Sequence, residues 1–166
     1  ASRLRSLRRH GESKRYFHNE VGYNSRLDTL QAAVLRVKLR TIDDDIRARA
    51  SIASAYSSGL NKINEIQIPV IRPYCDPVYY VYSLLTPFRD ELKRFLDEKE
   101  IGNAIYYPLP LHLQECFSFL GYREGDFPVA EKTARSILAL PIFPDMTPGE
   151  TDEVIAAVQS FFQSRG

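Results

Sequence analysis

The feature that most constrains the fold is a change in the hydrophobic pattern at a segment that has three prolines spaced four residues apart. Before it, apolar residues from Ser25 to Leu60 recur at spacings of three to five, and no proline or glycine in this stretch precedes Gly59. Such spacing is typical of an amphipathic helix. After it come Pro69, Pro73 and Pro77, through which a helix cannot continue. The sequence therefore predicts a helical first part and a second part built from other elements.

The helical stretch is predicted to form one long helix, or two helices joined near Thr41. Ser25 is the expected N-cap, because a serine hydroxyl can accept a hydrogen bond from a free backbone N–H of the first turn. Asp28 would then place a negative charge in that electropositive turn.

The second part alternates between strand and helix patterns. The expected order is a strand over 78–85, a helix over 88–99, a strand over 104–107, a loop over 108–128, a helix over 129–137, a strand over 138–142 and a last helix to about residue 163. Thr147, Pro148 and Glu150 carry the capping-box signature that starts this last helix. The sequence thus predicts a small α/β lobe after a long helical arm.

Charge and cysteine content argue against several functions. Residues 1–50 carry 12 Lys and Arg against 6 Asp and Glu, but the whole chain has a net charge of only +1, so nucleic-acid or membrane binding is not expected. No apolar run approaches the roughly 20 residues that cross a bilayer. Cys75 and Cys116 stand alone, and His10, His18 and His112 lack metal-ligand spacing, so we expect no disulfide framework and no metal. A cytoplasmic location is the simplest expectation.

Two segments carry polar groups suited to a site. Residues 22–28 place an amide, a hydroxyl, a guanidinium and a carboxylate at the start of a helix, where an anion can bind. On spacing alone, an ordinary helix cap beside a surface Arg–Asp pair is the commoner explanation for them. In residues 106–114, Pro108 and Pro110 stiffen a path that carries two phenols, an imidazole and an amide just past a predicted strand. A stiff surface loop with tyrosines packed on the core is the alternative there.

A series of motifs in fixed order resembles the DegT/DnrJ/EryC1/StrS family of pyridoxal-phosphate sugar aminotransferases. The motifs read RYFH at 15–18, GYNSRLD at 22–28, LQAA at 30–33, YYPLPLHLQ at 106–114, LGY at 120–122, GDFPVAE at 125–131 and LPIFP at 140–144. The resemblance spans nearly the whole chain.

This resemblance implies the fold of pyridoxal-phosphate-dependent transferases of the aspartate aminotransferase type I. The chain would supply the C-terminal part of a subunit: the end of the large domain with its connecting long helices over 1–62, and a small α/β domain with a short, mainly antiparallel sheet over 63–166. The family's Schiff-base lysine lies upstream of the matching stretch, and none of the six lysines here has its sequence context. We therefore expect no catalytic residue in this chain, and no activity from it alone.

The resemblance also implies roles for five residues. Asn24 matches an asparagine that reaches across a homodimer interface to the phosphate of the neighbour's pyridoxal phosphate. Arg26 matches an arginine near the sugar-nucleotide site. Tyr106 and Tyr107 lie on a loop that closes over the substrate, although many relatives have His at the first of these positions. His18, on the arm that faces the partner subunit, is a further substrate-binding candidate. The substrates implied are an amino acid donor, usually glutamate, and a nucleotide-linked keto-sugar of polysaccharide, O-antigen or antibiotic biosynthesis.

Two alternatives stay open at this point. A sugar dehydratase relative shares the fold and the cofactor but has His in place of the lysine. A regulatory or nucleic-acid-binding module would use the basic run from Arg3 to Arg15, which holds six cations and one acid.

His112 and Gln114 are motif positions that we expect to hold their loop in shape rather than to contact substrate.

Overall fold

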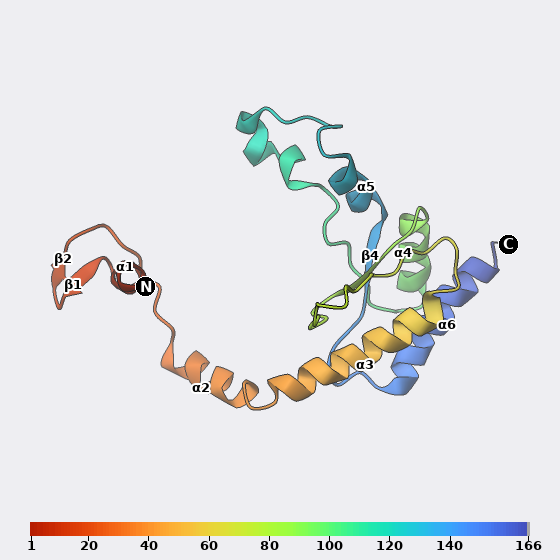
Figure 1. Cartoon of the computed structure of the whole chain (residues 1–166), viewed down its shortest axis with the longest axis horizontal. Helices are drawn as coiled ribbons and strands as arrows, with labels where there is room; N and C mark the ends of the chain where they lie inside the picture. The colour runs from red at the N-terminus through yellow and green to blue at the C-terminus, as the bar shows by residue number, and fades with distance from the viewer. Residues whose placement is uncertain (166) are drawn as a thin grey trace. The chain divides into compact units, whose positions relative to one another are not determined.

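A computed structural model describes residues 1–165 of the chain, and these fall into two compact units with a sequence boundary between Ile42 and Asp43. The first unit holds α1 (Ser2–Leu7), β1 (Glu12–Lys14), β2 (Phe17–His18) and α2 (Thr29–Lys38), and α3 (Ile42–Leu60) begins at the boundary (Figure 1). The second unit continues with β3 (Tyr82–Leu85), α4 (Arg89–Glu98), the short 3₁₀ helices η1 (Leu111–Leu113) and η2 (Glu115–Leu120), α5 (Pro128–Ser136), β4 (Ile137–Leu140) and α6 (Pro148–Gln163).

The predicted helical stretch is two helices, with residues 39–41 between α2 and α3. The expected cap at Ser25 is wrong. Asp28 is the N-cap of α2, and its carboxylate accepts a 2.8 Å hydrogen bond from the backbone N–H of Leu30. The N–H of Ser25 instead donates to the carbonyl oxygen of Arg8, which ties Ser25 to the end of α1 and leaves the helix to start four residues later.

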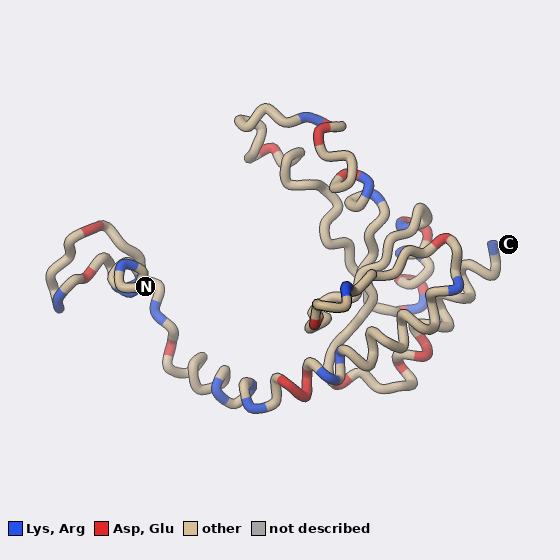
Figure 2. Tube along the Cα trace, viewed as in Figure 1, with Lys and Arg blue, Asp and Glu red and all other residues tan. Residues whose placement is uncertain are grey.

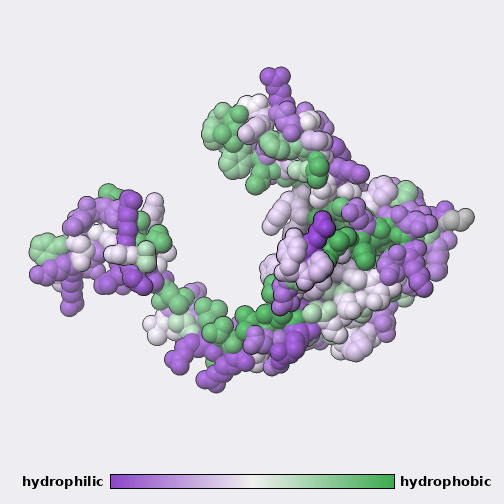
Figure 3. Space-filling view, viewed as in Figure 1, coloured by the Kyte–Doolittle hydropathy of each residue, from purple (hydrophilic) through white to green (hydrophobic). Residues whose placement is uncertain are grey.

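Helix α2 presents apolar side chains that the first unit does not cover. None of its ten residues is buried, and Figure 3 shows hydrophobic side chains along it. Leu30 and Val37 are 77% and 62% exposed. The regular apolar spacing therefore predicted the helix correctly, although nothing in its own unit packs against that face.

The second unit is built around an antiparallel strand pair. Strands β3 and β4 pair in the register Tyr82 with Leu140 through Leu85 with Ile137, as expected for a short antiparallel sheet. The predicted strand over 104–107 contributes only an isolated bridge between Ala104 and Ala139. The predicted strand over 78–85 begins only at Tyr82, after Tyr79 adopts a left-handed conformation (φ 44°) that interrupts extended backbone.

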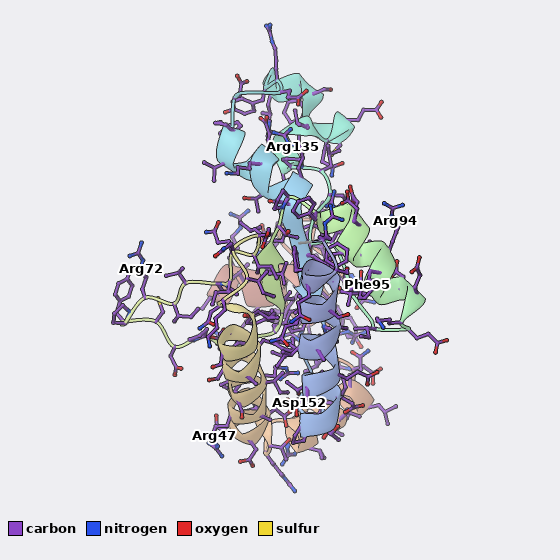
Figure 4. The ribbon with its side chains drawn as sticks, turned by 90° about the vertical axis from the view of Figure 1, so that its right-hand side faces the viewer. Arg47, Arg72, Arg94, Phe95, Arg135 and Asp152 are labelled. Carbon is purple, nitrogen blue, oxygen red and sulfur yellow. The ribbon has the colours of Figure 1, made fainter. Side chains whose placement is uncertain are left out.

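Helices α3, α4 and α6 bury the apolar residues of this sheet. Side chains that are fully buried there come from both strands and from all three helices: Tyr56, Leu60, Tyr82, Leu84, Leu92, Leu96, Leu138 and Val158. Helices α3 and α6 lie side by side (Figure 4), and the Gln159 side chain donates a 2.9 Å hydrogen bond to the carbonyl oxygen of Gly59. A Cβ on Gly59 would lie 2.7 Å from Cγ2 of Ile155, so glycine permits this close approach.

The face that α4 turns to α6 follows from its sequence periodicity. Figure 4 shows Phe95 directed toward α6 and Arg94, its neighbour in sequence, directed away from it. The rings of Phe95 and Phe161 lie 5.5 Å apart between centroids. The predicted apolar stripe of Leu92, Phe95 and Leu96 is confirmed, with Phe95 half-buried at its edge.

The ends of α6 and α3 are stabilised by local charge and hydrogen bonding. The predicted capping box is present: the N–H of Glu150 donates to the Thr147 hydroxyl at 3.2 Å, and the N–H of Thr147 donates to the Glu150 carboxylate at 2.7 Å. The first turn of α3 carries Asp43, Asp44 and Asp45, drawn red in Figure 2, which suits the positive end of a helix dipole.

Among the described helices, none has the length and apolar character needed to span a bilayer.

Candidate functional site

The side chains of Asn24 and Arg26 form one polar group on an exposed segment ahead of α2. The Arg26 guanidinium donates through Nε to Oδ1 of Asn24 at 3.3 Å, and both residues are exposed. Since Oδ1 of Asn24 accepts this bond, the Nδ2 group of the amide remains a donor for a ligand. Arg26 likewise retains the terminal nitrogens of its guanidinium, which suit a phosphate or carboxylate.

Backbone hydrogen bonds fix the segment that carries these two side chains. Asn24 forms an isolated antiparallel bridge with Arg9. On the preceding residue, the N–H of Tyr23 donates to the Leu7 carbonyl oxygen at 2.7 Å, and the Tyr23 carbonyl oxygen accepts from His10 N–H at 3.0 Å. The polar pair is therefore held against the end of α1 rather than carried on a free loop.

Two glycines allow this close backbone packing. A Cβ on Gly11 would lie 1.7 Å from the carbonyl oxygen of Glu20, and Gly11 has a φ of +74°. A Cβ on Gly22 would lie 2.1 Å from the backbone nitrogen of Gly11. Neither position can accept a side chain without displacing backbone, so the geometry around Asn24 depends on both glycines.

The N-terminus of α2 does not itself provide the anion site that the sequence suggested. The carboxylate of Asp28 already accepts from Leu30 N–H, so a second anion there would meet a negative charge. The groups in this segment that suit an anion are therefore the side chains of Asn24 and Arg26.

His18 lies in the same compact unit, on β2. Its Nδ1 is 3.0 Å from the carbonyl oxygen of His10, and because a carbonyl can only accept, this bond requires the proton on Nδ1. Nearby, the N–H of Tyr16 and the cation of Arg9 hold the pKa of Glu12 below its usual value, although partial desolvation opposes them.

Tyr106 and Tyr107 lie in the second unit, after the bridge at Ala104. Their side chains are 46% and 72% exposed, and their rings are 5.6 Å apart between centroids. Tyr106 lines an open hollow of about 340 Å³ together with Arg49 and Asn103. Tyr107 lines a separate apolar hollow of about 670 Å³ between residues 107–114 and α5.

Sequence reasoning missed the partner of His112. Its Nε2 lies 3.0 Å from Oε1 of Glu131, a carboxylate that is only 3% exposed. The same carboxylate accepts from the backbone N–H groups of Gly125 at 2.9 Å and Phe127 at 3.2 Å. Both residues stood in recognised motifs, but 19 positions separate them and no local signal links them. The interpretation that His112 holds its loop in shape agrees with this contact.

The lysines present lack the environment of a Schiff-base lysine. Five are exposed: Lys14, Lys38, Lys62, Lys99 and Lys132. Lys93 is half-buried and pairs with Asp97 at 2.7 Å. No group of three or more potential metal ligands occurs within residues 1–165, and both cysteines are exposed and unpaired with each other.

Comparison with known proteins identifies the family. The model of the DegT/DnrJ/EryC1/StrS aminotransferase family matches residues 1–159. The chain is 40% identical over 160 residues to the "erythromycin biosynthesis sensory transduction protein EryC1" of Saccharopolyspora erythraea, covering 96% of this chain and 44% of that protein. It is also 40% identical over 161 residues to the "dTDP-3-amino-3,4,6-trideoxy-alpha-D-glucose transaminase" of Streptomyces venezuelae, covering 97% of this chain and 42% of the relative.

The structural comparison agrees over almost the same extent. The crystal structure of S. venezuelae DesV superposes with a TM-score of 0.93 at 40% identity, over 96% of this chain and 43% of DesV. The chain thus spans less than half the length of the proteins that it matches, and it has the fold of the corresponding part of these aminotransferases. Its motifs, its fold and the match over residues 1–159 place this chain in the DegT/DnrJ/EryC1/StrS aminotransferase family.

Proposed function

We propose that the subunit containing this chain is a pyridoxal-phosphate-dependent aminotransferase that moves an amino group from an amino acid, glutamate in the first instance, to a nucleotide-linked keto-sugar. The observation that carries the proposal is the Asn24–Arg26 pair. It places an amide donor and a guanidinium side by side on a segment fixed by backbone hydrogen bonds, ahead of a helix whose apolar face is exposed.

The residues present fit a phosphate-bearing cofactor. The amide of Asn24 has its oxygen engaged by Arg26 and its Nδ2 available, which is the polarity that a phosphate oxygen needs. Asn24 would hold the cofactor phosphate of the partner subunit in a homodimer. When bound, pyridoxal phosphate supplies an electron sink for exchange of the amino group. The lysine that such chemistry requires would belong to another part of the subunit, since none of the six lysines here has the sequence context of the family's Schiff-base lysine.

The remaining residues would bind the substrate. Arg26 would neutralise a negative group of the sugar nucleotide, and His18 would contribute its imidazole from the same compact unit. Tyr106 and Tyr107 would form the loop over the sugar, where the exposed phenols can hydrogen-bond hydroxyl groups. Arg49 shares the hollow with Tyr106 and adds a positive charge to it.

Three further assignments belong to the same proposal. Residues 1–62 would end the large domain and connect it to the small domain over 63–166. The subunit would act as a homodimer, since Asn24 serves the neighbouring site. It would work in the cytoplasm.

The test uses the whole subunit, with pyridoxal phosphate, glutamate and a panel of nucleotide-linked keto-sugars. Formation of an amino sugar together with 2-oxoglutarate supports the proposal. The dehydratase alternative predicts a deoxygenated sugar and no consumption of glutamate. Absence of both products with every sugar, in a protein that binds the cofactor, would contradict the aminotransferase assignment.

The regulatory alternative rests on the basic run from Arg3 to Arg15. Two of its cations are already paired, Arg3 with Glu20 at 3.1 Å and Arg9 with Glu12 at 2.8 Å. These contacts reduce the charge available to a nucleic acid. A filter-binding assay that retained DNA in a strongly salt-dependent manner would favour the regulatory alternative instead.

A further inference from the structure

The loop that carries Tyr106 and Tyr107 is tied down at both ends by hydrogen bonds of different kinds. At its start, Ala104 and Ala139 exchange two backbone bonds, at 3.1 and 2.7 Å, which join it to the edge of β4. At its far end, the His112 imidazole reaches the carboxylate of Glu131 on α5 at 3.0 Å. Tyr106 and Tyr107 lie between these two attachments.

Packing alone does not hold the far end of this loop. Between residues 107–114 and α5 lies an apolar hollow of about 670 Å³, lined also by Phe127 and Ala130. Pro108 and Pro110 each fix one backbone φ angle between Tyr107 and His112, so this segment has fewer free rotations than an ordinary loop. The polar contact at His112 is therefore the firm attachment of this segment to the helix.

The carboxylate of Glu131 lies within hydrogen-bond distance of groups from three residues. Its Oε1 lies within hydrogen-bond distance of His112 Nε2, Gly125 N–H and Phe127 N–H, and its Oε2 is 3.0 Å from Gly125 N–H. Burial of the carboxylate raises its pKa, but these hydrogen bonds outweigh burial and hold the pKa of Glu131 below its usual value. The group is thus ionised near neutral pH and acts as a buried acceptor.

An aromatic contact supports the same arrangement. The ring of Phe127 lies 4.8 Å from the His112 imidazole and 5.0 Å from the Tyr122 ring, between centroids. His112 is consequently held by a carboxylate on one side and by an aromatic ring on another. This fixes where the segment of residues 107–112 meets α5.

We infer that Glu131 is a positioning residue for the substrate loop: through His112 it sets the placement of Tyr106 and Tyr107. The inference rests on the proposed function in so far as these tyrosines contact the nucleotide-linked sugar. Glu131 does not touch substrate in this arrangement, because its oxygens are occupied by His112, Gly125 and Phe127.

The test uses the whole subunit with Glu131→Gln, which keeps the shape of the side chain and removes its charge. The matched control is Glu124→Gln, which removes the same charge from an exposed carboxylate (76% exposed) one residue before Gly125. We expect KM for the keto-sugar nucleotide to rise about tenfold in Glu131→Gln. The reason is that the bond between His112 and residue 131 no longer has a charged acceptor. The half-reaction with the amino acid donor, and both half-reactions of the control, should keep their wild-type rates.

A second variant tests the link through the imidazole. His112→Phe keeps an aromatic ring against Phe127 and leaves Glu131 with its two backbone donors. We expect the same selective rise in KM, and a double variant with Glu131→Gln no worse than the more severe single variant, because both changes act on the same contact between His112 and Glu131. If Glu131→Gln does not fold, as judged by its melting curve, His112→Phe carries the test.

Amide hydrogen exchange decides the structural part independently of activity. In both variants, exchange should accelerate over residues 106–114 and stay unchanged in α6. Unchanged exchange over 106–114, or loss of both half-reactions to the same degree, would overturn the inference. A wild-type subunit without amino transfer would refute the proposed function alone, since the exchange result would still report on the attachment of the loop.

Discussion

The hydroxyl of Tyr56 donates a 2.7 Å hydrogen bond to the carbonyl oxygen of Pro141, 85 residues further along the chain. The bond joins the C-terminal half of α3 to the residue that follows β4, and the Tyr56 side chain is fully buried. Burial raises the pKa of this phenol, so it remains protonated and continues to donate at every physiological pH.

Replacing Tyr56 by Phe should therefore destabilise the second unit. The carbonyl of Pro141 loses its donor in a partly buried position, which costs about 1–2 kcal/mol. Urea unfolding followed by circular dichroism measures the effect. Tyr74→Phe is the control, because Tyr74 is 85% exposed. Equal stability of Tyr56→Phe and the wild type would contradict this account.

The capping box of α6 makes stability depend on acid pH. Hydrogen bonds from the backbone N–H and the hydroxyl of Thr147 hold the pKa of Glu150 below its usual 4.5. As pH falls below about 4.5, the unfolded chain takes up a proton there before the folded chain does, so the contribution is present above that value and is lost as pH falls through the lowered pKa.

Thr147→Ala should weaken both the cap and this pH dependence. Loss of an N-cap side chain costs about 1 kcal/mol at neutral pH. The variant should also lose less stability than the wild type between pH 5 and pH 3, because the hydroxyl no longer favours the ionised carboxylate. Thermal unfolding at several pH values provides the comparison, and parallel stability curves for the two proteins would count against the cap.

Asn24 should govern the affinity for the cofactor in the whole subunit. Asn24→Ala removes a donor to the phosphate, which is worth about tenfold or more in the dissociation constant. Asn24→Asp should be worse, since a carboxylate repels the phosphate. Titration with pyridoxal phosphate followed by absorbance measures both. Ser25→Ala is the matched neighbour and should bind as the wild type does; equal affinity in all four proteins would remove Asn24 from the site.

The two close-packed glycines should tolerate no side chain. Gly11→Ala forces a Cβ onto the Glu20 carbonyl oxygen in a backbone conformation that already disfavours it, at a local cost of about 1–3 kcal/mol. Faster amide exchange over residues 7–25 would report this. Gly102→Ala is the control because no atom lies within 4 Å of the Cβ position there. Exchange in Gly11→Ala that matched the control would show that the loop adapts.

Features with a local cause could be predicted from the sequence. The cap at Thr147 and Glu150 depends on groups three residues apart, and the structure has it as expected. The apolar stripe of α4 follows directly from helical spacing. Asn24 and Arg26 were found through family motifs, and their hydrogen bond agrees with a shared role that stays a prediction until the whole subunit is tested.

Features that depend on distant parts of the chain were missed. The residues over 104–107 have strand propensity, but of these only Ala104 pairs with β4, through an isolated bridge to Ala139. Whether the other residues find a partner strand depends on the tertiary structure and not on their own sequence. Ser25 is a good cap by type, yet its N–H pairs with Arg8 and the helix starts after Asp28. The bond between His112 and Glu131 joins two motifs whose contact depends on how η2 and α5 turn back on the loop.

The exposure of α2 has a thermodynamic consequence. A helix of ten residues is marginally stable in water when no other surface packs against it. The free-energy cost of nucleating the helix offsets most of the free energy gained from its backbone hydrogen bonds. Its leucines and valines can stabilise it only when they leave the solvent. Helical order over residues 29–38 is therefore expected to depend on burial of this apolar face against a further surface.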